Sequence, residues 1–237
     1  FGYKTLDEDN VFKSTMAFPN DLKGMKSMLK WSDKLSDPAV PASFVIEATG
    51  VYHEHAAYFL VDENKAISVV LPNKIFNFSK TLQMKTVDDR IASKTITTFG
   101  LEKKLELWKK PLPVFAKLKQ FTRERNQLLE EKTAIQNQLH AEKHSAFQVQ
   151  ESIKRYTTRI ALFDKQIKEI EKDIKAVLDA NPEIKEKVRK VCKAPGLGMI
   201  TVVTAAAETN GFHEIRNQRQ LVSYSGYDVV SKNSGTS

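Results

Sequence analysis

The chain has 237 residues, which is enough for two modest folding units. It carries 37 Lys and Arg against 29 Asp and Glu, and this formal net charge of +8 favours a polyanionic partner. Its single cysteine, Cys192, excludes a disulfide framework and fits a reducing, cytoplasmic setting, and no apolar run approaches the roughly 18 residues of a membrane span.

Residues 1–113 have the pattern of an α/β domain. Residues 23–35 have the apolar spacing of a helix, residues 42–48 form an apolar, β-branched strand, residues 50–63 return to helix, and residues 66–72 form a second strand that Pro72 stops. The order strand–helix–strand predicts a parallel pair with a right-handed crossover. Residues 88–100 predict a further helix, with Gly100 as its C-terminal stop.

Acidic residues stand at two points of this domain where they suggest chemistry. Glu47 ends the first predicted strand, and open α/β sheets bind ligands at the carboxyl ends of their strands. Asp88 and Asp89 open the last helix, and converging carboxylates are what Mg²⁺ needs. The structural alternatives are Glu47 as an acid favoured by a helix dipole and Asp88 as an ordinary N-cap.

Residues 114–180 contain no Gly or Pro and predict a coiled coil. A seam with spacings of three and four runs through the second half, at Ile153, Tyr156, Ile160, Phe163, Ile167, Ile170, Ile174 and Val177. The seam of the first half is weaker, because Arg125 and Lys132 interrupt it. Residues 143–152 suggest a turn between two antiparallel arms, and one long dimerising helix is the alternative. The seam predicts a homo-oligomer, whereas the charge pattern alone fits a solvated helix surface equally well.

Residues 181–237 predict helix, turn and helix, followed by a polar tail. The turn "PGLG" at 195–198 contains Gly196 and Gly198 and exposes backbone N–H groups at a helix N-terminus. Such groups bind a phosphate without sequence preference, as in helix–hairpin–helix modules, although an ordinary tight turn is the alternative. Basic residues of this segment are further candidates for DNA contacts, namely Lys193, Arg216 and Arg219.

The tail "SKNSGTS" at 231–237 contains three serines, each a hydroxyl nucleophile that needs an activating base or metal. A plain polar loop is the structural alternative for this tail.

Five segments together resemble a known family. These are "EATGVYHEHAAYFL", "SVVLPNKIFNFSKTLQMKTVDDRIASKTITTFG", "LKQFTRERNQLLEEKTAIQNQLHAE", "APGLGMITVVTAAAETNGF" and "RQLVSYSGYDVVSKNSGTS", in that order. They resemble the DEDD transposases of bacterial insertion sequences, the insertion-sequence one-ten family, which is related to the Piv DNA invertase.

The resemblance implies an RNase H-like (RuvC-like) domain in which four acids, Asp-Glu-Asp-Asp, bind Mg²⁺. Glu47 and Asp89 match the second and third acids, and Ala92 stands where the fourth is expected. Asp88 is the adjacent carboxylate that could substitute for it. The first Asp is expected on a strand before Phe1.

The resemblance further implies that a coiled coil and a C-terminal transposase domain at 181–237 follow the first domain. The family's catalytic serine, which forms a covalent bond to DNA, falls on Ser234. Some members of the family use a structured guide RNA. Two other functions compete with a bacterial transposase or recombinase: a RuvC-like metal-dependent nuclease without a serine step, and a non-catalytic coiled-coil protein that bridges nucleic acids.

Overall fold

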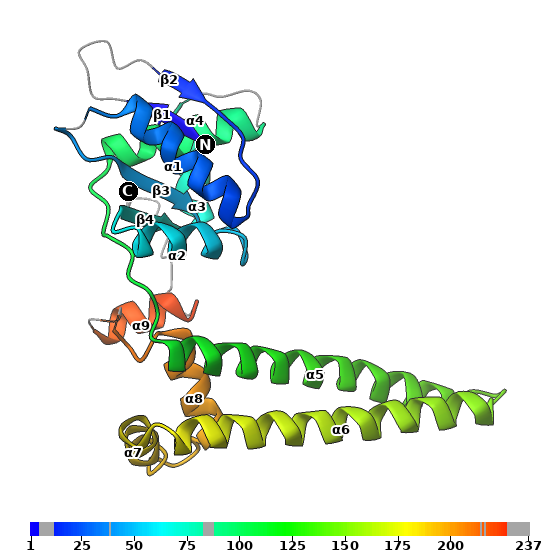
Figure 1. Ribbon diagram of the computed structural model, residues 1–237. Coiled ribbons are helices and arrows are strands. Elements are labelled where there is room, and N and C mark those ends of the chain that lie inside the picture. The colour runs from blue at the N-terminus through cyan, green and yellow to red at the C-terminus, as the bar shows by residue number, and fades with distance from the viewer. Residues whose placement is uncertain (5–11, 38, 83–87, 214, 216, 227–237) are drawn as a thin grey trace, which may run out of the picture. The chain divides into compact units, whose positions relative to one another are not determined.

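The computed structural model describes residues 1–4, 12–37, 39–82, 88–213, 215 and 217–226 (Figure 1). The chain divides into two compact units, Phe1–Lys110 and Pro111–Ser237. The first combines short strands with helices, and the second is helical throughout its described residues.

Two strand pairs form the sheets of the first unit. Strands β1 (Gly2–Lys4) and β2 (Phe12–Thr15) pair antiparallel, and the sequence pattern did not predict them. Strands β3 (Ser43–Glu47) and β4 (Ala66–Val70) pair in parallel and are joined through helix α2 (Glu54–Asp62). The predicted parallel pair is therefore confirmed, and its register places Glu47 opposite Val70 at the carboxyl edge.

Helix α1 (Leu22–Leu35) packs one apolar face against α2 and the β3–β4 pair, as its spacing predicts. The Asp21 side chain begins the helix by accepting a hydrogen bond from Gly24 N at 2.7 Å. Met28 of α1 is buried together with Leu60 of α2 and Ile67 of β4, and these side chains form the centre of one apolar core.

Helix α3 (Pro72–Thr81) was not predicted, because Pro72 was interpreted only as the end of a strand. Proline is favoured in the first turn of a helix, where its missing N–H would have no partner in any case. Pro72 thus ends β4 and begins α3. Ile75 and Phe78 of α3 are buried beside Val70 and Phe99 in a second apolar core.

Helix α4 (Asp89–Glu102) continues past Gly100, so the prediction that Gly100 stops the helix is wrong. A Cβ atom at position 100 would lie 2.5 Å from Cγ2 of Val45, so glycine there allows α4 to pack closely on β3. One turn earlier, the Thr97 hydroxyl, which donates to Ser93 O at 2.7 Å within the helix, also lies 3.3 Å from the Gly2 carbonyl oxygen of β1. Helix α4 therefore contacts both strand pairs.

Two long helices of the second unit, α5 (Pro113–His144) and α6 (Gln150–Asp179), lie side by side and are joined at one end by residues 145–149 (Figure 1). We call this pair the helical hairpin. The predicted turn between antiparallel arms is confirmed, and the alternative of one continuous helix is wrong. Leu118 of α5 and Ile174 of α6 are almost fully buried.

The two charges that interrupt the apolar seam of α5 form ion pairs across the helical hairpin. Arg125 Nε lies 2.8 Å from a carboxylate oxygen of Glu171, and Lys132 Nζ lies 2.6 Å from one of Asp164. Both cationic side chains are mostly buried, with about a fifth of their surface exposed. These pairs fix which residues of the two arms stand opposite one another.

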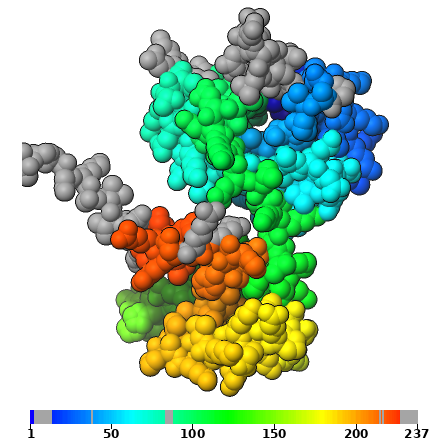
Figure 2. Space-filling model, turned by 90° about the vertical axis from the view of Figure 1, so that its left-hand side faces the viewer, coloured from blue at the N-terminus to red at the C-terminus, as the bar shows by residue number. Residues whose placement is uncertain are grey.

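Three short helices pack at the open end of the helical hairpin, which we call its base. They are α7 (Pro182–Val191), α8 (Met199–Glu208) and α9 (Gln218–Tyr224). Figure 2 shows the orange α8 between the yellow helices α6 and α7 on one side and the red α9 on the other. Val203 of α8 is fully buried in one core with Phe115 and Ile174, so the start of α5 and the end of α6 share this core.

Candidate active site

Glu47 lies at the carboxyl end of β3 and is half buried. The chain turns shortly after it, because Thr49 N donates to the Glu47 carbonyl oxygen at 2.9 Å and Gly50 has a φ of 52°. The Thr49 hydroxyl donates to Oε1 of Glu47 at 3.0 Å, which orients the carboxylate at the edge of the parallel pair. No described residue donates a hydrogen bond to the second carboxylate oxygen, which a ligand could therefore contact.

Asp88 and Asp89 differ in what their carboxylates do. Asp88 is the N-cap of α4 and accepts a hydrogen bond from Ile91 N at 2.7 Å. This confirms the interpretation of Asp88 as an ordinary N-cap. Asp89 is the first residue of α4 and is exposed. Ala92 occupies the next turn and provides no ligand. Asp89 is therefore the freer of the two acids.

The acidic residues of the described chain do not form a complete metal site by themselves. Across residues 1–4, 12–37, 39–82, 88–213, 215 and 217–226, no three His, Cys, Asp or Glu side chains lie together in a way that could hold an ion. Glu47, Asp88 and Asp89 are thus not a three-carboxylate cluster, and a metal at this edge would need further ligands.

The predicted turn at 195–198 joins α7 to α8 and is exposed. Gly196 has a φ of 82°, which favours glycine, and Gly198 is the N-cap of α8 and has no capping side chain. Apart from the adjacent residues, no atom of the described chain lies within 4 Å of an added Cβ at either glycine, so a phosphate has open access to this helix N-terminus. Lys193 and Arg219 are exposed, and Arg216 lies outside the described residues.

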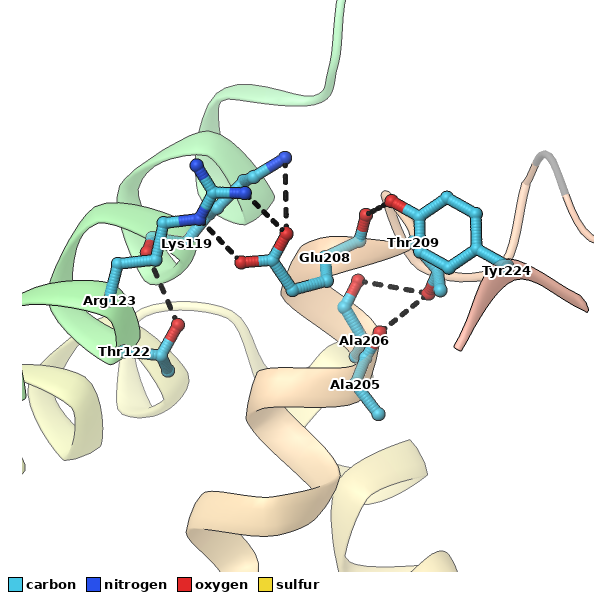
Figure 3. Close-up of polar contacts among 8 residues, drawn as sticks. All are labelled: Lys119, Thr122, Arg123, Ala205, Ala206, Glu208, Thr209 and Tyr224. Carbon is cyan, nitrogen blue, oxygen red and sulfur yellow. Dashed lines mark hydrogen bonds and ion pairs between the residues drawn. The ribbon is translucent and has the colours of Figure 1, made fainter. Parts of the chain in front are cut away.

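A polar network at the base of the helical hairpin was not predicted (Figure 3). Arg123 of α5 donates two hydrogen bonds to the Glu208 carboxylate, at 2.7 and 2.8 Å, and Lys119 lies 3.3 Å from the same group. The Tyr224 hydroxyl of α9 donates to Glu208 O at 2.9 Å. Eighty-five positions separate Arg123 from Glu208, so no local sequence pattern could indicate the pair.

Glu208 is held in its charged form by this network. Burial raises the pKa of Glu208, but the hydrogen bonds from Arg123 and the charges of Lys119 and Arg123 outweigh it, and the pKa lies below its ordinary value. Only 26% of the Glu208 side chain is exposed. The ionised carboxylate thus attaches the end of α8 to α5.

The turn after Glu208 is formed by three consecutive residues with positive φ values. Asn210, Gly211 and Phe212 have φ values of 47°, 69° and 64°, and Leu112 N donates to the Asn210 side chain at 3.0 Å. A Cβ at Gly211 would lie 2.5 Å from Cε2 of Phe115, so only glycine fits against the first turn of α5. The turn and the Tyr224 hydrogen bond together place α9. Ser234 follows this helix and lies outside the described residues.

Two family models match the chain. A model of DEDD transposases of the IS110 type, described as "Transposase", matches residues 4–148. This is more than half of the chain. The protein belongs to the IS110-type DEDD transposase family. A second model of the same family, described as "Transposase IS116/IS110/IS902 family", matches residues 188–237.

Relatives of the family extend the similarity along the chain. Two pilin gene-inverting proteins, from Moraxella bovis and Moraxella lacunata, are each 23% identical to it over 225 residues. The alignments cover 93% of this chain and 66% of each relative, so the chain spans just under two thirds of their length. Within the described residues, no helix is both long and apolar enough to cross a membrane.

Proposed function

We propose that the protein is a DNA transposase or site-specific recombinase that binds, cleaves and rejoins DNA. The order of the two family matches supports this most strongly, because the first and the last parts of the chain each match a transposase model. The Moraxella relatives are named for inverting a gene, which is a rearrangement of DNA. The net charge of +8 suits a nucleic acid partner.

The first unit is proposed to be RNase H-like. Its parallel β3–β4 pair and the packing of α4 on both strand pairs support this assignment. Among the described residues, β1 pairs only with β2 and β3 only with β4. The family resemblance implies a further strand that carries the first acid of the motif.

Glu47 and Asp89 are proposed as two of the catalytic carboxylates. Glu47 is favoured by its place at the sheet edge and by the Thr49 hydrogen bond, and Asp89 by its exposed carboxylate. Asp88 is less suited, because it caps α4. Mg²⁺ is proposed as the cofactor, since it takes oxygen ligands and binds phosphate oxygens. The first Asp of the family motif would have to complete the Mg²⁺ site.

Ser234 is proposed as the nucleophile, on the basis of its match to the serine of the family tail. Its hydroxyl oxygen would attack a DNA phosphorus and form a phosphoserine ester, while a deoxyribose oxygen leaves. A serine hydroxyl is a poor nucleophile until a base takes its proton, so groups outside the tail must approach it. The helical hairpin, proposed to be a coiled coil, would bring the two catalytic parts together, within one chain or in a homo-oligomer.

DNA phosphates are proposed to contact the turn at Gly196 and Gly198, with Lys193, Arg216 and Arg219 as cations. The open N-terminus of α8 supports this, because backbone N–H groups there bind phosphate without regard to sequence. A structured guide RNA is a further proposed partner, on the basis of the family resemblance alone.

The test uses the full-length protein with its DNA and Mg²⁺, with and without a guide RNA. Ser234→Ala should keep DNA binding and lose the denaturant-resistant protein–DNA adduct on a gel. Ser237→Ala is the matched control and should keep the adduct. An adduct in the Ser234→Ala variant would shift the assignment to Ser231 or Ser237. Cleavage by the wild type without any adduct would instead favour the RuvC-like nuclease.

A further inference from the structure

Two of the five histidines of the chain, His140 and His144, stand one helical turn apart near the end of α5. Their rings are stacked, with centroids 4.2 Å apart and planes inclined by 26°, and both side chains are exposed. Histidines four residues apart on a helix share one face, which is the spacing that places two imidazoles on one metal ion in helical zinc sites. The stacked rings already occupy neighbouring positions.

A hydrogen bond fixes the tautomer of one ring. His144 Nδ1 lies 2.8 Å from the carbonyl oxygen of His140. Because a carbonyl oxygen only accepts, Nδ1 carries a proton, and in the neutral ring Nε2 keeps its lone pair. Metal-binding histidines commonly donate their second N–H to a backbone carbonyl in this way. In the described chain, neither His140 nor His144 Nε2 has a hydrogen-bond partner.

We infer that His140 and His144 chelate one borderline transition-metal ion, such as Ni²⁺, Cu²⁺ or Zn²⁺, through their two Nε2 atoms. Imidazole suits these ions, whereas Mg²⁺ prefers oxygen ligands. Two nitrogens at about 2.0–2.1 Å from one ion lie roughly 3.0–3.3 Å apart. The ring centroids are 4.2 Å apart, and both exposed side chains must turn out of their stacked arrangement so that the two Nε2 lone pairs converge on the ion. No third protein ligand lies nearby in the described residues, so water completes the coordination.

Such an ion would hold the last turn of α5. The final carbonyls of a helix lack partners within it, and the helix ends fray for this reason. The chain already ties this end down through Val149 N, which donates to the Glu142 side chain at 2.8 Å, and Gln148 Nε2, which donates to Lys143 O at 2.6 Å. A chelate between His140 and His144 would add a link on the other side of the same turn. This inference is independent of the proposed function.

The experiment titrates untagged, full-chain protein with Ni²⁺ alone by calorimetry at pH 7.5. We expect one ion per chain. His140→Gln and His144→Gln should each weaken binding about tenfold or more, because one of two ligands is lost. His55→Ala, His213→Ala and Cys192→Ser should bind as the wild type does. Circular dichroism should show unchanged helix content, since both histidines are exposed.

A composition-matched variant separates geometry from histidine content. Ala141→His combined with His144→Gln keeps two neighbouring histidines but places them about 100° apart around the helix. It should bind Ni²⁺ as weakly as His144→Gln alone. Equal affinity of this variant and the wild type would overturn the inference, as would wild-type affinity in His144→Gln or half an ion per chain.

Discussion

Gly211 and Gly196 both have positive φ values, 69° and 82°, but their surroundings differ. An alanine Cβ at position 211 would meet the Phe115 ring at 2.5 Å, whereas none of the described atoms lies within 4 Å of one at position 196. Gly211→Ala should therefore lower the free energy of unfolding by about 3 kcal/mol, through backbone strain and overpacking. Gly196→Ala is the matched control and should cost about 1 kcal/mol. Urea unfolding followed by circular dichroism measures both, and equal losses would contradict the close contact.

The Arg123–Glu208 pair makes stability depend on pH. The pKa of Glu208 is lowered in the folded protein, so the pair stabilises the fold above the unfolded pKa of about 4.3 and this contribution is lost as the pH falls through the folded pKa. Arg123→Gln should cost about 1 kcal/mol at pH 7, since Arg123 is largely exposed. Urea unfolding at pH 7 and pH 3 should show the difference between wild type and variant shrinking at the lower pH. Arg189→Gln, which breaks an exposed pair within α7, is the control and should change little at either pH.

Single residues show why a local pattern can be right about position and wrong about role. Gly100 was predicted to end a helix, and its actual role is contact with Val45, a residue 55 positions away. Asp88 was interpreted both as an N-cap and as a metal-binding carboxylate, and its hydrogen bond to Ile91 N confirms the N-cap. Glycine and aspartate have several structural uses, and only the three-dimensional neighbours decide between them.

The elements were predictable where one stripe of apolar residues determined them. The α6 seam, the β3–α2–β4 unit and α1 all follow from spacing within one segment. The ion pairs Arg125–Glu171 and Lys132–Asp164 did not, because the partners lie on different helices and meet only when the hairpin closes. A charge within an apolar seam is informative only once the opposite arm is in place.

The α6 seam is expected to hold the arms of the helical hairpin together. Ile167→Lys with Ile170→Lys introduces two charges at positions 8% and 6% exposed, and should unfold the hairpin, because unpaired buried charges cost several kcal/mol. Circular dichroism should show a marked loss of helix. Ala161→Lys with Leu162→Lys adds the same charges at exposed positions of α6 and should leave the helix content unchanged. Equal helix content in both double variants would contradict the packing of the seam.

At the scale of the whole molecule, the net charge of +8 predicts DNA binding that weakens steeply with salt. For the full-length protein, a plot of log affinity against log salt should be linear, with a slope set by the number of phosphate contacts. Lys193→Gln should reduce this slope by about one and weaken binding equally for unrelated DNA sequences. Lys26→Gln on α1 makes the same change of net charge and should leave the slope unaltered. An identical slope in the Lys193 variant would remove this lysine from the DNA interface.

The arrangement of the chain into an α/β part followed by helices was accessible from the sequence, because composition changes sharply along it. The β1–β2 pair was not, since its strands are three and four residues long and too short for an alternation to be recognised. The contacts at the base of the hairpin were also inaccessible, because they join α5 to α8 across some 85 positions. Family resemblance predicts Glu47 and Asp89 as catalytic carboxylates, whereas periodicity alone left their roles open.

The helical hairpin leaves and re-enters the base at one end, where Phe115 and Ile174 share a core. The length of the hairpin can therefore change without a change in the core at its base. At 1.5 Å per residue, the 30 residues of α6 extend about 45 Å, and removing seven residues from each arm would shorten this by about 10 Å. The remaining apolar residues of the two arms would still face one another, and the helix ends at the base would keep their positions. Related proteins can therefore change the length of the hairpin in paired steps of seven residues without altering the packing at its base.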